Sequence, residues 1–306
     1  MYKLPVKIKL SPIPLLVIFS IFIFSVFIFL ITFTKNQNNS NKITITTSFY
    51  PLWEFTNNIS GTNINVINIT PPGIEPHDFE PTTKDIEDIF NSKIFIYNGA
   101  GIDKWTDKIL DKLNDRGIVV INMTENLGIG QNSDPHFWLN PLLASNAVDI
   151  IQNEIIKIDS KNSNIYTENS NKYKSQLTKL LSDFDKNLAS CNKKMIITAH
   201  DAFEYLAKRY NLKVISISGI EPNIDPSTKQ IANIITTAKN NKIKYVFFES
   251  LLSPKISQSI ANEIGGETLM FDPIEGISQN DIQNGSNYIS IQYNNLDSLK
   301  KALECN

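Results

Sequence analysis

The chain opens with one long apolar run and then alternates short apolar segments with amphipathic ones. Residues 15–33 carry no charge, and as a helix rising about 1.5 Å per residue they would cross the hydrocarbon core of a membrane. Lysines flank this run, and the positive-inside rule places the N-terminus in the cytoplasm and everything after Lys35 outside. We therefore expect residues 1–35 to be a membrane anchor or a signal segment.

The length of the run favours an uncleaved anchor over a cleaved signal peptide. Signal peptides have an apolar core of about 7 to 15 residues followed by small residues, and this run fits neither feature well. No cysteine directly follows the run, so a lipid-modified cysteine is not expected. Residues 36–41 read NQNNSN and predict a polar tether. The body of the protein is thus expected at the extracytoplasmic face of the membrane, with secretion or a periplasmic location as the alternative.

Beyond the tether, strand patterns alternate with helical ones. Short connections between such elements predict right-handed βαβ units and a largely parallel sheet. The alternation occurs twice, which predicts an N-terminal α/β lobe at 42–160 and a C-terminal one at 191–306. The predicted strands are residues 42–49, 63–70, 93–97, 118–123, 194–199, 213–217, 245–249 and 268–271.

Between the two lobes lies the longest helical pattern of the chain. Tyr173, Leu177, Leu180 and Phe184 recur at helical spacing, and no Pro or Gly interrupts residues 166–188. We expect an α/β fold of two lobes, each with a mostly parallel sheet flanked by helices. One long rigid connector helix at 161–190 would join the lobes, although an ordinary core helix would give the same pattern.

Charge narrows the range of functions. The chain has 31 acidic and 29 basic residues, and four of the lysines flank the N-terminal apolar run. The exported part is therefore acidic, which argues against nucleic-acid binding because a basic face is needed for phosphates. An acidic body suits a protein that handles cations.

The three histidines of the chain all follow predicted strands. His77 lies in the loop GIEPHDFEP, His136 in DPHFWLNP, and His200 directly after the strand at 194–199; Asp272 follows the last predicted strand. Open α/β folds build their sites at this end of the strands. Two lobes facing each other could therefore bring three imidazoles and one carboxylate to a single tetrahedral ion.

Other residues near these positions could have either of two roles. Glu75, Asp134 and Glu249 could accept hydrogen bonds from the imidazole N–H groups, or could be solvated loop carboxylates. Cys191 and Cys305 are the only thiols, and an oxidising exterior would permit a disulfide between them. The sequence alone does not establish that bond.

Four motifs together resemble those of the zinc- and manganese-type solute-binding proteins of ABC importers. The likeness covers nearly everything from residue 43 to the C-terminus. It implies two α/β lobes joined by a single helix, which clamp one divalent metal ion with His77, His136, His200 and Asp272 and deliver it to a membrane permease. The motifs are Glu75-Pro-His77-Asp-Phe-Glu80-Pro, Asp134-Pro-His136-Phe-Trp-Leu-Asn-Pro141, Ala199-His200-Asp-Ala-Phe-Glu-Tyr205 and Phe271-Asp272-Pro.

The third ligand position bears on the identity of the metal. In the family it is commonly histidine in zinc receptors and glutamate in many manganese receptors, and this chain has His200. Three imidazoles and one carboxylate suit Zn²⁺ better than Mn²⁺, which is kept as the alternative. Many zinc receptors also have a His- and Asp-rich loop, whereas residues 122–133 are short and contain neither residue type.

Three kinds of function fit a metal site of this composition. The expected one is a monomeric, non-enzymatic receptor that passes zinc to a permease. A zinc hydrolase would need an open coordination position and a general base, and the chain has no His-Glu-X-X-His pattern. A surface adhesin with a structural metal is the third reading, since such a site is also saturated with protein ligands.

Overall fold

A computed structural model describes residues 42–130 and 133–305. The predicted membrane segment at 1–35 and the tether at 36–41 lie outside these residues. Within the described part, no helix is both long enough and apolar enough to cross a membrane. The described residues from Ile43 onward belong to one compact unit, Ile43–Asn306.

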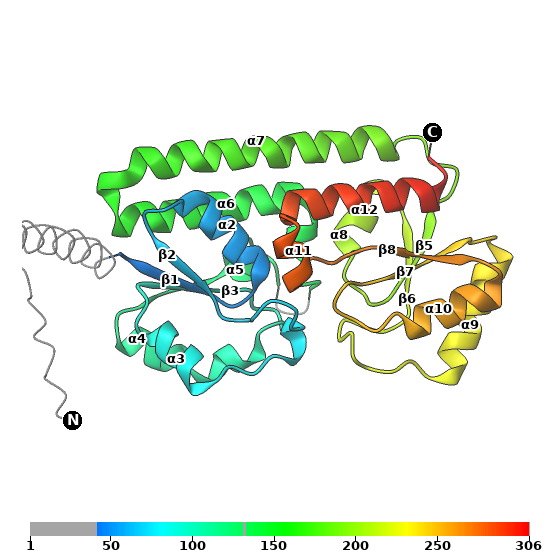
Figure 1. Cartoon of the computed structure of the whole chain (residues 1–306), viewed down its shortest axis with the longest axis horizontal. Coiled ribbons are helices and arrows are strands. Elements are labelled where there is room, and N and C mark those ends of the chain that lie inside the picture. The colour runs from blue at the N-terminus through cyan, green and yellow to red at the C-terminus, as the bar shows by residue number, and fades with distance from the viewer. Residues whose placement is uncertain (1–41, 131–132, 306) are drawn as a thin grey trace, which may run out of the picture. The chain divides into compact units, whose positions relative to one another are not determined.

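The first half of this unit is built on a four-stranded parallel sheet (Figure 1). The strand order is β2-β1-β3-β4, so Ile45 of β1 pairs with Val66 on one side and Ile94 on the other. All four strands lie within segments predicted from the sequence. They are β1 (Thr44–Thr47), β2 (Asn65–Asn68), β3 (Ile94–Tyr97) and β4 (Val119–Asn122).

Capping residues set the limits of the helices in this half. Pro51 lies in the first turn of α2, and Gly61, with a φ of 56°, ends it in the left-handed region. Thr82 and Asp85 form the predicted capping box at the start of α3. The helices are α2 (Tyr50–Ser60), α3 (Thr83–Phe90), α4 (Leu110–Asp115), α5 (Met123–Asn126) and α6 (Pro141–Ile158), with 3-10 turns at Pro76–Asp78, Lys104–Lys108, Phe137–Leu139 and Ser160–Asn162.

One predicted helix is divided. The pattern at 103–113 predicts a single helix, whereas the structure has a 3-10 turn followed by α4. The buried carboxylate of Asp103 accepts the backbone N–H of Asn98 at 2.6 Å and that of Gly99 at 2.9 Å, and the Ser48 hydroxyl at 2.6 Å. These bonds fold the chain into a tight loop just before the expected helix.

The second half repeats the strand-helix alternation. β5 pairs with β6 and β7 with β8, both in parallel, and β5 lies next to β7. The mostly parallel character predicted for both halves is therefore confirmed. The elements are β5 (Met195–Thr198), β6 (Lys213–Ser216), β7 (Tyr245–Phe248) and β8 (Glu267–Met270), with α8 (Glu204–Tyr210), α9 (Thr228–Asn240), α10 (Lys255–Ile264), α11 (Gln279–Gln283) and α12 (Tyr288–Leu303).

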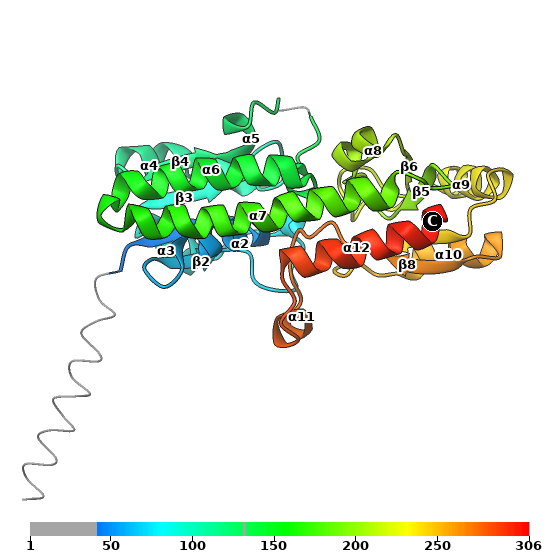
Figure 2. The ribbon, with the colours of Figure 1, turned by 90° about the horizontal axis from the view of Figure 1, so that it is seen from above.

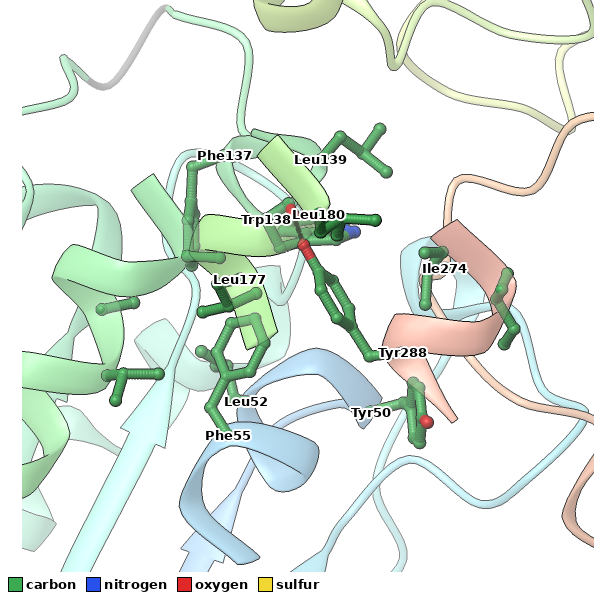
Figure 3. Packing of buried hydrophobic residues seen from close by; sticks show 14 of the residues in the cluster. Tyr50, Leu52, Phe55, Phe137, Trp138, Leu139, Leu177, Leu180, Ile274 and Tyr288 are labelled. Atoms are coloured by element: carbon green, nitrogen blue, oxygen red, sulfur yellow. Dashed lines mark hydrogen bonds between the residues drawn. The ribbon is translucent and has the colours of Figure 1, made fainter. Parts of the chain in front are cut away.

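A 26-residue helix, α7 (Ser163–Leu188), runs beside the elements of both halves (Figures 1 and 2). It packs on α2 and α6 from the first half and on α12 from the second. The sequence interpretation did not assign α12. Leu177 and Leu180 of α7 and Tyr288 of α12 belong to one buried cluster, together with Phe55 and Trp138 (Figure 3). The main core is therefore shared by the two halves.

A disulfide joins Cys191, just after α7, to Cys305, just after α12. The two cysteines also form an isolated antiparallel bridge, and Lys193 donates its backbone N–H to the Leu303 carbonyl at 2.9 Å. The end of the chain is thus fastened to the start of the second half.

Removal of this bond is expected to destabilise the protein. The cysteines are 114 residues apart, and a cross-link over a loop of that size restricts the unfolded chain, with a typical effect of roughly 2–4 kcal/mol. We expect the double variant Cys191→Ser/Cys305→Ser to unfold at lower denaturant concentration than the oxidised protein. Equal midpoints for oxidised and reduced wild-type protein would contradict this prediction.

Candidate metal-binding site

Four side chains from distant parts of the chain converge on one buried point. Glu275 Oε1 lies 2.8 Å from His136 Nε2, 3.2 Å from His200 Nε2 and 3.4 Å from His77 Nε2. One candidate ligand atom from each of these residues lies within 4.8 Å of the other three. Each side chain is at most 1% exposed. The structure thus brings together the three histidines singled out in the sequence.

The carboxylate in this cluster is that of Glu275, whereas the sequence interpretation gave this place to Asp272. Asp272 is buried, but its Oδ1 accepts the backbone N–H of Ile274 at 2.7 Å. Asn295 of α12 binds both the backbone N–H and the carbonyl of Asp272, at 2.8 and 2.7 Å. Asp272 therefore shapes the turn after β8, and the residue three positions later enters the cluster.

That turn depends on an unusual backbone conformation. Ile274 has a φ of 56°, in the left-handed region that a β-branched residue rarely adopts. Its side chain is fully buried in the main core, which offsets the strain (Figure 3). This conformation, together with the hydrogen bond to Asp272, directs Glu275 toward the histidines.

Two hydrogen bonds hold this turn against the loops that carry His77 and His136. The indole N–H of Trp138, two residues after His136, donates to the Pro273 carbonyl at 2.7 Å. The backbone N–H of Gly73 donates to the Ile277 carbonyl at 2.9 Å. The first half of the protein thereby contacts the turn both before and after Glu275 in the sequence.

Asp134 partners the His136 ring, in a place suited to the outer role considered for it. Its Oδ1 lies 2.6 Å from His136 Nδ1 and accepts the backbone N–H of His136 at 2.9 Å. Burial alone would lower the pKa of His136, but Asp134 and Glu275 outweigh burial and raise it. Nε2 is left facing Glu275.

Glu249 partners the His200 ring in the same way. Both of its carboxylate oxygens lie 2.8 Å from His200 Nδ1, and Oε1 also accepts the His200 backbone N–H at 3.1 Å. Burial would lower the pKa of His200, but Glu275 and Glu249 raise it well above its ordinary value. A carboxylate behind each ring fixes the ring orientation and makes the other nitrogen a better ligand.

Glu75, the third candidate for such a role, does not contact the ring of His77 in this way. Its Oε1 accepts the backbone N–H of His77 at 3.4 Å. Burial and the nearby Glu275 carboxylate raise the pKa of Glu75 to about 10. His77 Nδ1 instead faces Oε2 of Glu221 at 3.8 Å. The sequence interpretation did not select Glu221.

The donor set fits a divalent cation that prefers nitrogen and oxygen ligands. Burial raises the pKa of Glu275, but His200, His136 and His77 reverse that effect and hold it well below its ordinary value, so Glu275 is anionic. Its Oε2 is buried with no hydrogen-bond partner among the described residues. Three imidazoles and one carboxylate, whose second oxygen is buried and unpaired in the described part of the chain, match the ligands that Zn²⁺ takes in proteins.

The sequence contains a weak signal for Glu275. Gly276 follows it, and a Cβ at that position would come within 2.9 Å of Leu251 Cδ1 and 3.3 Å of the Ile74 carbonyl oxygen. Glycine at position 276 permits this close approach of the backbone beside the Glu275 carboxylate. Glu221 has no comparable signal, because it lies in a long loop between β6 and α9.

The chain is similar in sequence to known zinc-uptake proteins. A family model described as "Zinc-uptake complex component A periplasmic" (ZnuA) matches residues 45–302. The high-affinity zinc uptake system protein ZnuA of Bacillus subtilis is 32% identical over 280 residues, which cover 86% of this chain and 88% of that protein. The zinc-binding lipoprotein AdcA of Streptococcus pneumoniae is 30% identical, but this chain spans only 56% of its length.

Solved structures show the same likeness. The Zn(II)-bound ZnuA-like domain of Streptococcus pneumoniae AdcA has a TM-score of 0.78 and 32% identity, covering 86% of this chain and 100% of that one. The laminin-binding protein of Streptococcus agalactiae, described as bifunctional with adhesin and metal-transporting activity, has a TM-score of 0.77 and 29% identity, with 85% and 99% coverage. The chain therefore belongs to the ZnuA family, whose members are solute-binding receptors and not enzymes.

Proposed function

We propose that this protein is an extracytoplasmic zinc receptor that captures the ion and delivers it to an ABC importer permease. The observation that carries the proposal is the convergence of His77, His136, His200 and Glu275 within 4.8 Å. All four side chains are buried, so the ion would be held by protein ligands alone. Such a site suits capture and release, because it offers no open position for a substrate of catalysis.

Zinc is preferred to manganese on the chemistry of the donors. Three imidazole nitrogens and one carboxylate oxygen are typical zinc ligands, whereas manganese favours sites richer in oxygen. Family relatives described as zinc uptake and zinc-binding proteins support the same choice. The affinity order of divalent metals gives less support, since it favours zinc in most nitrogen-rich sites.

An adhesive role is the second candidate, because one structural relative is described as an adhesin as well as a metal transporter. In a purely structural site the ion would not exchange. A receptor must exchange it. Metal analysis of protein purified without added ions, followed by competition between zinc and manganese and by chelator exchange, separates a zinc receptor, a manganese receptor and a structural site.

The arrangement of the chain supports a receptor held outside the cell. We propose that residues 1–35 act as the anchor and 36–41 as the tether, with lobes at 42–160 and 191–306. In this proposal α7 is the stiff connector that limits closure of the lobes around the ion to a modest movement. Solution scattering profiles that are identical with and without metal would contradict a large closure.

Loss of the carboxylate at position 275 should weaken zinc binding. Replacing an outer partner of a ligand costs about 10–100-fold in affinity, and we expect Glu275→Gln to cost at least as much because it removes the one anionic ligand. The measurement is the zinc dissociation constant from competition with a chelator.

Asp272→Asn is the matched control for that substitution. Its side-chain oxygen can still accept the N–H of Ile274, so the turn persists and the affinity should change far less than in Glu275→Gln. An equal loss of affinity in the two variants would contradict the assignment of Glu275 as the ligand.

Zinc binding should release protons near neutral pH. The pKa values of His136 and His200 are raised in the metal-free site, so protons compete with zinc already above the ordinary imidazole value of about 6.5. Affinity should therefore fall as the pH is lowered from about 8 to about 6. Calorimetry in buffers of different ionisation enthalpy measures the released protons, and a binding reaction without proton release would count against three histidine ligands.

A further inference from the structure

The loop between β6 and α9, residues 217–227, links the segment that carries His200 to the segment that carries His77. Near the start of the loop, Ser218 donates its backbone N–H to the Ala199 carbonyl at 2.8 Å. Asp201 donates its backbone N–H to the Gly219 carbonyl at 3.1 Å. These bonds fasten the loop on both sides of His200. Farther along, the loop reaches the first half of the protein.

Two side chains of the loop make that contact. Glu221 forms an ion pair with Lys104, and the Asn223 amide donates to the Asp78 carboxylate, next to His77. The other oxygen of Glu221 lies 3.8 Å from His77 Nδ1. A single loop of the second half therefore reaches the one histidine whose ring has no close carboxylate partner.

His77 differs from the other two histidines in how its ring is held. His136 and His200 each have a carboxylate at 2.6–2.8 Å from Nδ1, and each carboxylate comes from the same half as its histidine. His77 Nδ1 is buried without a hydrogen-bond partner among the described residues, and the carboxylate facing it comes from the opposite half. A ligand histidine needs a partner for its second nitrogen to fix its tautomer and orientation.

We propose that Glu221 is the positioning residue of His77 and that it controls how fast the site releases zinc. This inference rests on the proposed function. Glu221 is 37% exposed and shares its carboxylate with Lys104, which is 65% exposed, whereas Asp134 and Glu249 are at most 5% exposed. Of the three carboxylates, Glu221 is therefore the one that solvent, salt or a docking protein can reach.

This position makes His77 the first ligand to leave. When Glu221 moves away with its loop, His77 loses its orienting partner, while Asp134 and Glu249 still hold the other two rings. The Lys104 pair lies at the surface, so salt screens it and zinc release should accelerate as ionic strength rises.

The test uses the zinc-loaded full chain mixed rapidly with an excess of a fluorescent zinc chelator, and the release rate is recorded. Glu221→Ala should release zinc about tenfold faster, at the lower end of the effect of losing an outer partner. Glu221→Gln should release it at a rate between those of the wild type and Glu221→Ala, because an amide oxygen can face His77 Nδ1 but the ion pair with Lys104 is lost. Asp225→Ala, an exposed acid in the same loop, is the matched control and should not change the rate.

The outcomes distinguish the two proposals. If the wild type takes up zinc and Glu221→Ala releases it at the wild-type rate, the role of Glu221 is overturned and the receptor assignment stands. Equal acceleration in Glu221→Gln and Glu221→Ala, or in Asp225→Ala, would also overturn the positioning role. A wild-type chain that takes up no zinc would overturn the proposed function and this inference together. Without metal, the variants should melt at the same temperature as the wild type. A lower melting temperature would indicate a general loss of structure.

Discussion

The site depends on the hydrogen bonds made by Trp138. Its indole donates to the Pro273 carbonyl, and its own carbonyl accepts the hydroxyl of Tyr288 (Figure 3). The Trp138 side chain is fully buried, so breaking either bond would leave a polar group with neither a hydrogen-bond partner nor access to water. Because Trp138 follows His136 and Pro273 precedes Glu275, these bonds hold two candidate ligands from different halves against each other.

Charge balance then makes the buried cluster tolerable. An isolated carboxylate such as Glu275 would be costly to bury, but the histidines around it compensate, and Asp134 and Glu249 lie behind two of the rings. The carboxylates therefore have distinct roles. Glu275 faces the centre, whereas Asp134 and Glu249 orient the rings and Asp272 shapes the backbone.

The sequence predicted the parts of this arrangement that follow from periodicity and missed those that follow from turn geometry. The strands and the three histidines could be found because apolar alternation marks strand ends. The α12 helix was missed because buried Gln292 and Asn295 interrupt its apolar stripe. Asp272 was chosen over Glu275 because nothing in the sequence announces that Ile274 adopts a left-handed conformation or that Asp272 is occupied by a backbone N–H.

The apolar core shared by the two halves limits how far they can separate. Ile45 from the first half, Leu180 of α7 and Leu299 of α12 belong to one continuous apolar cluster. Pulling the halves apart would expose that cluster to water and invite aggregation outside the cell. Because of this cost, a movement that opens the buried cluster must be small, so that the shared apolar core stays out of contact with water.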